Sequence, residues 1–271
     1  MKITILVDNH ACGELPGEWG LSAYCRYGDL RVLLDAGQSD LFLQNAAALG
    51  IDLDKVDFGV LSHAHYDHAD GISYFLDANQ AAPFYLRKGC DENCYEIDPD
   101  GTVRYIGIRK GLLAKYADRI RYAEGDAEIA QGVFLIPHKT AGMEEQGRAA
   151  HMFTLVDGCR LTETFAHEQS LVFRTEKGLV ILNSCSHGGA DNIITEVAET
   201  FPGEKLYAII GGFHLYMKED EEVRAFARRL RDTGICHVIT GHCTGDRGYE
   251  ILQEELGDRI RQLHVGMTID L

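Results

Sequence analysis

The sequence predicts an α/β fold with mixed β-sheets, and three observations support this prediction. Short strand-like segments occupy residues 3–7, 21–27 and 30–34, and Gly28-Asp29 is a hairpin turn between the last two. Beyond them, apolar runs of strand length alternate with segments of helical periodicity in both halves of the chain. Alternation of this kind is typical of α/β proteins, and the early hairpins add antiparallel pairing to the sheets.

The elements of the first half lead toward a histidine-rich segment. A helix is expected between Ser39, a residue type that caps helix N-termini, and Gly50, which lies just past the helix end. Residues 56–61 form a short apolar run of the buried-strand type. A further helix is expected to begin at Asp67 or His68, because the apolar residues that follow have helical spacing.

The middle of the chain gives weaker signals. Residues 89–101 and 142–150 are rich in turn-forming residues and are predicted as loops. We interpret residues 77–150 as an insertion over the core and not as a second domain, because no linker or repeat sets them apart. The whole chain, residues 1–271, is therefore predicted to be a single domain.

The second half alternates between strands and helices again. Strands are expected at 170–174, 179–183, 206–210, 235–240 and 260–265. Amphipathic helices are expected at about 193–198, 219–232 and 249–256.

Composition limits the classes of partner. Asp and Glu number 42 and Lys and Arg 26, which gives a formal net charge of −16. Such a surface repels phosphate backbones and argues against a nucleic-acid partner, although bound divalent cations would reverse the sign locally. No apolar run is long enough to span a membrane, and no secretory leader is seen at the first residues. We expect a cytoplasmic protein whose eight cysteines are reduced thiols.

The segment 63–68 carries four metal-ligating side chains in six residues: His63, His65, Asp67 and His68. In an extended segment, side chains two residues apart point the same way, so His63 and His65 can hold one ion. Asp67 and His68 lie at the first turn of a helix and can serve a second ion. Imidazole and carboxylate bind zinc, iron and manganese. Incidental histidines in a surface loop are a weaker interpretation, because this segment directly follows a buried strand.

Further candidate ligands lie beside apolar strands in the second half. They are His167, Cys185, His187, His214 and His242. Any one of them alone would more often be a loop or packing residue than a ligand. Strand ends on one edge of a sheet converge on a shared cleft, however, so repeated placement there indicates a common metal site.

These motifs resemble the metallo-β-lactamase superfamily. The H-x-H-x-D-H run is its signature, and Leu33-Leu34-Asp35-Ala36-Gly37 resembles the D-x-G strand end that precedes it. The resemblance covers essentially the whole chain and implies an αββα sandwich of two mixed β-sheets flanked by helices. It also implies that the metal site lies at one edge of this sandwich.

Four later segments are similar to a prokaryotic branch of this superfamily. Its members are labelled metal-dependent hydrolases or dihydropterin–ribofuranosylaminobenzene phosphate synthase-like proteins. The segments are His167-Glu168-Gln169-Ser170-Leu171-Val172, Cys185-Ser186-His187-Gly188, Gly211-Gly212-Phe213-His214-Leu215 and His242-Cys243-Thr244-Gly245.

One position departs from the superfamily pattern. The resemblance assigns His167 to the third motif and His242 to the final histidine. The bridging aspartate of the family would then fall at Cys185. A Cys185 thiolate can bridge, His187 can substitute, or the site lacks a protein bridge. His214 has no counterpart in the general pattern and is a candidate to bind substrate.

The predicted function is hydrolysis of an ester or phosphoester bond in a small molecule, phosphorylated or not. Two divalent ions, zinc first with iron or manganese as alternatives, would share a water and supply hydroxide at neutral pH. The first ion would be held by His63, His65 and either His167 or His187; the second by Asp67, His68 and His242. Asp67 and His214 are the candidate catalytic residues, and Asp35 is a candidate partner for a ligand imidazole.

Three alternatives remain open at this stage. An iron-containing redox enzyme would suit cysteines near the metals, the branch label suggests a pterin or phosphoribosyl-compound synthase, and a metal-binding regulator would show no turnover. Cys90 and Cys94 are predicted to form no zinc site, since no second ligand pair is close in sequence. Phosphate contacts from Arg109-Lys110, Lys139 or Arg148 are less favoured than simple solvent exposure. The sequence does not determine the oligomeric state.

Overall fold

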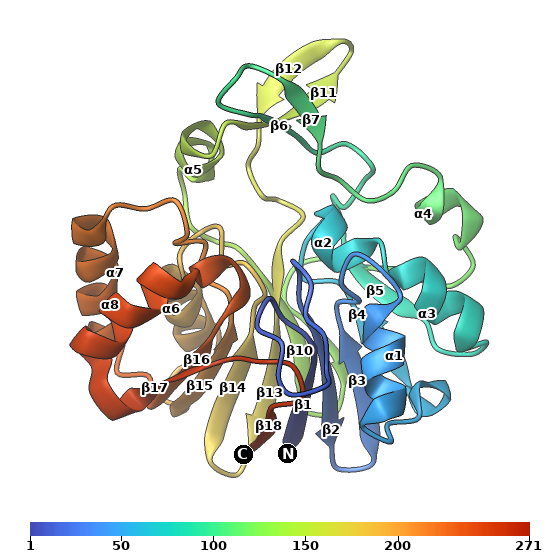
Figure 1. Cartoon of the computed structure of the whole chain (residues 1–271), viewed down its shortest axis with the longest axis horizontal. Coiled ribbons are helices and arrows are strands. Elements are labelled where there is room, and N and C mark those ends of the chain that lie inside the picture. The colour runs from blue at the N-terminus through green and yellow to red at the C-terminus, as the bar shows by residue number, and fades with distance from the viewer.

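A computed structural model describes residues 1–271. Two seven-stranded sheets pack face to face, and helices cover the outer face of each (Figure 1). The strand orders are β18-β1-β2-β3-β4-β5-β8 and β17-β16-β15-β14-β13-β10-β9. The predicted αββα sandwich of mixed sheets is confirmed.

The first sheet is built mostly from the N-terminal half. Its strands are β1 (Lys2–Val7), β2 (Ser22–Tyr27), β3 (Leu30–Leu34), β4 (Phe58–Val60), β5 (Phe84–Arg87), β8 (Ile120–Ala123) and β18 (Thr268–Asp270). Its helices are α1 (Leu41–Ala48), η1 (Leu53–Lys55), α2 (Tyr66–Ala69), α3 (Ile72–Ala78) and α4 (Leu112–Lys115). Strands β1, β2 and β3 pair antiparallel, whereas β3, β4, β5 and β8 pair parallel, as the early hairpins and later alternation predict.

The second sheet follows the same plan. Its strands are β9 (Ala127–Ala130), β10 (Val133–Pro137), β13 (Gln169–Thr175), β14 (Gly178–Leu182), β15 (Leu206–Gly211), β16 (His237–Thr240) and β17 (Ile260–Gln262). Its helices are α6 (Ala190–Thr200), α7 (Asp220–Asp232), η2 (His242–Thr244), α8 (Asp246–Leu256) and η3 (Gly257–Arg259). In this sheet, β9, β10, β13 and β14 pair antiparallel with one another in that order. Strands β14, β15, β16 and β17 pair parallel.

Three buried apolar clusters hold the sheets and helices together as layers. One of 21 buried residues lies between the two sheets, and clusters of 28 and 23 lie between each sheet and its helices. Strand β14 shows the alternation that makes this possible. Val180 and Leu182 face the other sheet, while Leu179 and Ile181 face the helices, because successive side chains point to opposite faces.

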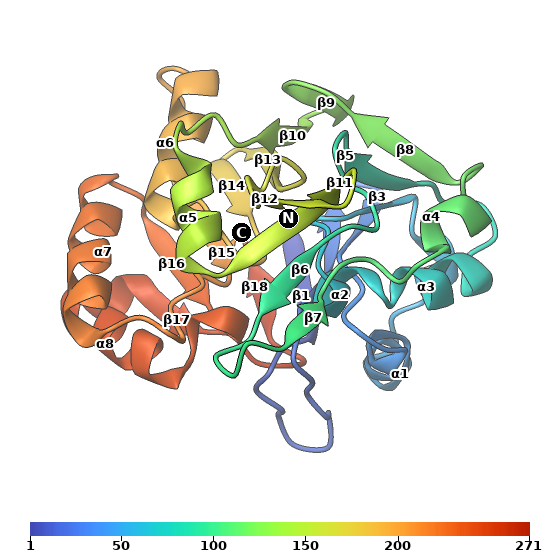
Figure 2. The same cartoon turned by 90° about the horizontal axis from the view of Figure 1, so that it is seen from above.

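A third, four-stranded sheet lies across one end of the sandwich (Figures 1 and 2). It consists of β12 (Cys159–Thr162), β11 (Met152–Val156), β6 (Tyr95–Ile97) and β7 (Val103–Tyr105), and α5 (Met143–Ala149) packs beside it. We call this sheet with α5 the cap. The two chain termini lie at the opposite end of the sandwich (Figure 1).

The predicted insertion at 77–150 needs correction. Strands β5, β8, β9 and β10 lie within this range and belong to the two large sheets, and the cap extends to residue 162. The loop predictions were also wrong where β6 and α5 form. These elements are short, and they are stabilised by contacts with β11 and β12 more than by local periodicity. The assignment of the whole chain to one domain stays a prediction. None of the helices is both long and apolar enough to cross a membrane.

Candidate metal centre

The predicted ligands meet beneath the cap. Strands β4, β14, β15 and β16 all end at this side of the sandwich, and each is followed by a loop that carries candidate residues. Nine of the predicted site residues are buried: Asp35, His63, His65, Asp67, His68, His167, Cys185, His187 and His242. His214 is half-buried. Burial of so many polar side chains in one place requires partners for them.

The first group of ligands consists of His63, His65 and His187. Their ligand atoms lie within 4.8 Å of one another, and the Nε2 atom of each ring is buried without a hydrogen-bond partner. Burial lowers the pKa of His65 to about 3 and the pKa values of His63 and His187 well below the usual range. Three neutral rings that turn unpaired nitrogens toward one point fit a divalent metal ion, whose ligand imidazoles must be neutral.

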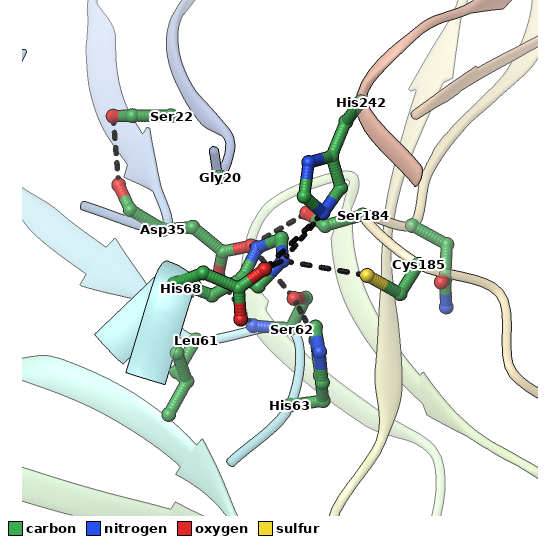
Figure 3. Close-up of polar contacts among 12 residues, drawn as sticks. Gly20, Ser22, Asp35, Leu61, Ser62, His63, His68, Ser184, Cys185 and His242 are labelled. Atoms are coloured by element: carbon green, nitrogen blue, oxygen red, sulfur yellow. Dashed lines mark hydrogen bonds and ion pairs between the residues drawn. The ribbon is translucent and has the colours of Figure 1, made fainter. Parts of the chain in front are cut away.

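Hydrogen bonding fixes the free nitrogen of His63. The Ser62 hydroxyl donates to Asp35 Oδ2 at 2.7 Å, and Ser62 Oγ lies 2.9 Å from His63 Nδ1 (Figure 3). Since the hydroxyl proton is used on Asp35, Ser62 Oγ accepts from the Nδ1–H of His63. The lone pair therefore resides on Nε2, the atom that faces the ligand group.

The second group consists of Asp67, His68 and His242. The two Nε2 atoms lie 3.2 Å apart, and Asp67 Oδ2 is 3.3 Å from one and 3.4 Å from the other. Both rings are held from behind: Asp35 Oδ2 lies 2.9 Å from His68 Nδ1, and Asn9 Oδ1 lies 3.1 Å from His242 Nδ1. Each Nδ1–H donates to an oxygen, so the two Nε2 atoms are the ring nitrogens that would face an ion.

The electrostatics of this second group favour a cation. Burial opposes the positive charge of His68, but the carboxylates of Asp67 and Asp35 raise its pKa to about 10. Asp35 is itself held in place, because Ser62 N and the Ser184 hydroxyl also donate to it, at 2.7 and 2.5 Å. A metal ion at Nε2 would supply the positive charge that these carboxylates stabilise.

Cys185 lies between the two groups. Its Sγ is 3.3 Å from His68 Nε2, and its sulfur, a His63 nitrogen and a His68 nitrogen lie within 4.8 Å of one another (Figure 3). This is the strand-end position at which the family resemblance expects a bridging aspartate. A thiolate there would carry the same charge.

His167 does not join His63 in this arrangement. Its Nδ1 accepts a hydrogen bond from the backbone N–H of Ala64 at 3.1 Å, and its Nε2 lies 3.7 Å from both Cys94 Sγ and Glu163 Oε1. Of the two residues left open for the first ion, the structure thus brings His187 to the group. His167 instead forms a separate cluster with His65 and Cys94, whose ligand atoms lie within 4.8 Å.

Cys90 lies next to this separate cluster without belonging to it. Its Sγ donates to the carbonyl oxygen of His167 at 3.4 Å. The prediction that Cys90 and Cys94 form no zinc site between them stays a prediction, but the spatial neighbours of Cys94 were not visible in the sequence.

A pocket of about 570 Å³ of empty volume opens above both ligand groups. His214 lines it, with its ring centroid 4.5 Å from that of His187. Burial, together with the nearby His242, lowers the pKa of His214 to about 4, so its ring is neutral at pH 7. The cap contributes Arg104, and the opposite wall contributes Trp19 and Tyr216.

Sequence analysis missed the residues that hold the ligand loops. Asp8 Oδ2 accepts from the His242 backbone N–H at 3.0 Å. Glu168 is fully buried, accepts from the His187 N–H at 3.3 Å and pairs with His138 Nε2 at 2.8 Å. Asp8 follows strand β1 and His138 follows β10, so polar residues directly after buried strands were a usable but weak signal.

Comparison with known proteins shows the family to which this chain belongs. The family model described as the metallo-beta-lactamase superfamily matches residues 21–149. The crystal structure of Tm1679, described as a metal-dependent hydrolase of the beta-lactamase superfamily, is 32% identical with a TM-score of 0.85. That similarity covers 100% of this chain and 99% of the other. The chain belongs to the metallo-β-lactamase superfamily.

Two further relatives extend the comparison. A protein of Methanocaldococcus jannaschii named 7,8-dihydropterin-6-methyl-4-(beta-D-ribofuranosyl)-aminobenzene-5'-phosphate synthase is 27% identical over 248 residues, 88% of this chain and 84% of its own length. The metallo-beta-lactamase fold protein YhfI from Bacillus subtilis has a TM-score of 0.58 at 14% identity over 99% of both chains, which shows the fold alone.

Membership in the metallo-β-lactamase superfamily confirms the resemblance seen in the sequence motifs. It implies that the chain binds divalent metal ions and acts on small molecules, as members of this largely hydrolytic superfamily do. The three neutral imidazoles of the first group, and the carboxylates that favour positive charge in the second, fit such ions.

Proposed function

We propose that this metallo-β-lactamase-fold chain is a hydrolase that uses two divalent ions, zinc first, on an ester or phosphoester bond of a small molecule. The observation that carries the proposal is the pair of adjacent ligand groups. One presents three unpaired Nε2 atoms, and the other presents two Nε2 atoms 3.2 Å apart beside a carboxylate. The location that fits this proposal is the cytoplasm, where the eight free thiols would stay reduced.

Each ion would have its own protein ligands. His63, His65 and His187 would hold the first; Asp67, His68 and His242 would hold the second; and Cys185 would contact both. When bound, the ions would supply Lewis acidity and a water molecule of lowered pKa.

The remaining chemistry falls to side chains of the pocket. Asp67 has a buried carboxylate whose pKa, although burial raises it, is held well below its usual range by His68 and His242. It is therefore ionised at pH 7 and can orient a water molecule or accept its proton. The neutral ring of His214, which lines the pocket, can donate or accept a hydrogen bond with substrate.

The pocket favours a small substrate with little negative charge outside the metal centre. Arg104 is the single lysine or arginine among its lining residues. Its guanidinium is already paired with Glu96 at 2.5 Å and with Asp98 at 3.3 Å. The earlier candidates for phosphate contacts, among them Arg109 and Lys139, do not line the pocket and pair with surface carboxylates.

A second candidate function is a synthase that acts on a pterin or phosphoribosyl compound. The observation that favours it is the similarity to the Methanocaldococcus jannaschii synthase over 84% of that protein. An identity of 27% leaves the reaction of this chain open to test. A redox enzyme, the third alternative, would require two irons and a visible chromophore.

One experiment separates these candidates. The protein is purified without added metal, its metals are quantified, and phosphate esters, phosphodiesters, lactones, thioesters and phosphoribosyl compounds are assayed with zinc, manganese or iron. Hydrolysis of one class with zinc or manganese is expected, and it should be lost in His65→Ala and retained in His237→Ala, which changes an exposed histidine. Fully metal-loaded protein that hydrolyses nothing on the panel would overturn the proposal.

A further inference from the structure

The loop after β16 brings a second thiol to the candidate metal centre, at a position that neither predicted ligand set includes. Cys243 lies in η2, directly after His242, and is 1% exposed. It lines the pocket together with Cys185, which comes from the loop after β14. The two sulfurs therefore reach the same cavity from two different strand ends.

The geometry of this pair is that of a ligand set. The sulfurs of Cys185 and Cys243 and a ring nitrogen of His242 lie within 4.8 Å of one another. His242 also belongs to the group with Asp67 and His68. An ion held by His242 would therefore have both thiols and the nitrogen and oxygen atoms of the second group within reach.

The hydrogen bonds around Cys243 leave its sulfur as an acceptor in the pocket. The backbone N–H of His214 donates to Cys243 Sγ at 3.2 Å. The carbonyl oxygens that could accept from an S–H group, those of Ser184 and Cys185, are 4.0 and 3.8 Å away, which is long even for sulfur. Cys243 Sγ therefore accepts a close hydrogen bond from the backbone but has no close backbone oxygen to which an S–H group could donate.

The backbone next to Cys243 Sγ has conformations that allow a close approach to the sulfur. A Cβ atom added to Gly212 would lie 2.5 Å from Cys243 Sγ, so glycine is needed for the approach. His214 and His242, which flank the sulfur, both have left-handed φ angles, 50° and 46°. Strained non-glycine residues of this kind persist where the surrounding structure over-determines them, and they gather at functional sites.

We propose that Cys243 is a metal ligand, and that Cys185, His242 and Cys243 make the second position thiolate-rich. The inference rests on the proposed metal centre but not on hydrolysis as its reaction. Two thiolates select zinc or iron over manganese and magnesium, because soft sulfur ligands bind soft or borderline ions. The second position, with two thiolates, is thus expected to discriminate against manganese more strongly than the first position, which has three imidazoles and at most the Cys185 thiolate.

Cobalt substitution tests this proposal without any substrate. Metal-free protein is refilled with Co(II), and the thiolate-to-cobalt charge-transfer band in the near ultraviolet is measured along with cobalt content. Cys243→Ser and Cys185→Ser should each reduce the band by about half, and the double variant should abolish it. Cys25→Ser is the matched control, because Cys25 is fully buried in β2 and belongs to no ligand group.

The outcomes separate the proposals. A full band in folded Cys243→Ser, or a band that Cys185→Ser alone abolishes, overturns the role of Cys243. If Cys243→Ser does not fold, 113Cd NMR of the wild type decides: a resonance with the shift of two thiolate ligands supports the proposal, and resonances with one thiolate or none overturn it. If every hydrolase assay fails while the charge-transfer band has the predicted dependence on Cys185 and Cys243, only the proposed reaction is contradicted.

Discussion

The two ligand groups of the metal centre are built differently. The first, with His63, His65 and His187, is uncharged, and its members have no carboxylate directly behind them. In the second, Asp67 supplies a negative charge, and Asp35 stands directly behind His68. In the first group, carboxylates act only indirectly, through the Ser62 hydroxyl and the His187 backbone, whereas in the second a carboxylate contacts the rings directly.

This difference predicts how each position should behave. A cation in the second group gains from two buried carboxylates, so it should be held more tightly than a cation among three neutral rings. The first position depends instead on the loop that carries His187. That loop is attached through Glu168, whose carboxylate accepts the His187 N–H and pairs with His138.

Removal of one ligand from each group should have the largest effect. His65→Ala should empty the first position and His68→Ala the second, each with metal affinity reduced by about 100-fold or more, because ligands matter at least as much as the residues behind them. Elemental analysis beside circular dichroism would check this, with His237→Ala as control. Full occupancy in both folded variants would contradict the two-metal arrangement.

His138→Ala should destabilise the fold and weaken mainly the first position. His138 lies between Glu168 and Glu196, at 2.8 and 3.3 Å. Burial opposes its charge, but these two carboxylates raise its pKa to about 10. Its removal leaves two buried carboxylates without a cation, at a cost of about 3 kcal/mol. Chemical denaturation and metal titration measure the two effects; unchanged stability would show that the ion pair contributes nothing.

Substitutions at Cys185 test its position between the groups. Cys185→Asp should keep metal binding better than Cys185→Ala, by about 10-fold, because an anionic ligand is retained. Competition with a chelator gives the affinities. Equal metal content in the wild type and the alanine variant would assign Cys185 to packing and leave His187 as the contact from that loop.

Asp35→Asn should weaken the second position by about 10-fold to 100-fold, and the first position less. The amide keeps the shape of the side chain but loses the charge that orients the Nδ1–H of His68. Isothermal titration with zinc measures the change, and Asp29→Asn is an exposed control. Equal losses at both positions would show that Asp35 supports the first group as strongly, through Ser62.

The smallest expected effect concerns His10, which supports the second group through Asp8. Hydrogen bonds to Asp8 at 2.9 Å and Asp246 at 2.7 Å outweigh burial and raise the pKa of His10 to about 9. A raised pKa stabilises the fold fully below about pH 6.5, and this stability is lost as the pH rises through about 9.

The partly exposed ring of His10 limits its contribution to about 1 kcal/mol. Unfolding free energies of the wild type and His10→Gln, measured at pH 6 and pH 10, should therefore differ more at pH 6. If the difference in unfolding free energy is the same at both pH values, His10 does not stabilise the fold through its charge.

The sequence by itself predicted an α/β fold with mixed sheets, its motifs implied the αββα sandwich through family resemblance, and it predicted the part of the site that lies within one segment. Alternating apolar runs predicted β13 to β17 and the helices between them, because hydrophobic periodicity is strong where strands are buried on both faces. The run 63–68 revealed its ligand character because local backbone geometry sets the spacing of its side chains. Cap elements such as β6 and α5 were missed, since they are too short for such patterns.

Only the tertiary structure decided which distant residues lie together at the candidate centre. It separated His187 from His167, set Cys185 and Cys243 side by side, and put Asp8 behind His242, 234 residues away in the chain. The physical reason is that these distances depend on how the two sheets pack and on how β14, β15 and β16 align at the shared end. A ligand set drawn from several strand ends is a property of that packing, which no single segment of the chain encodes.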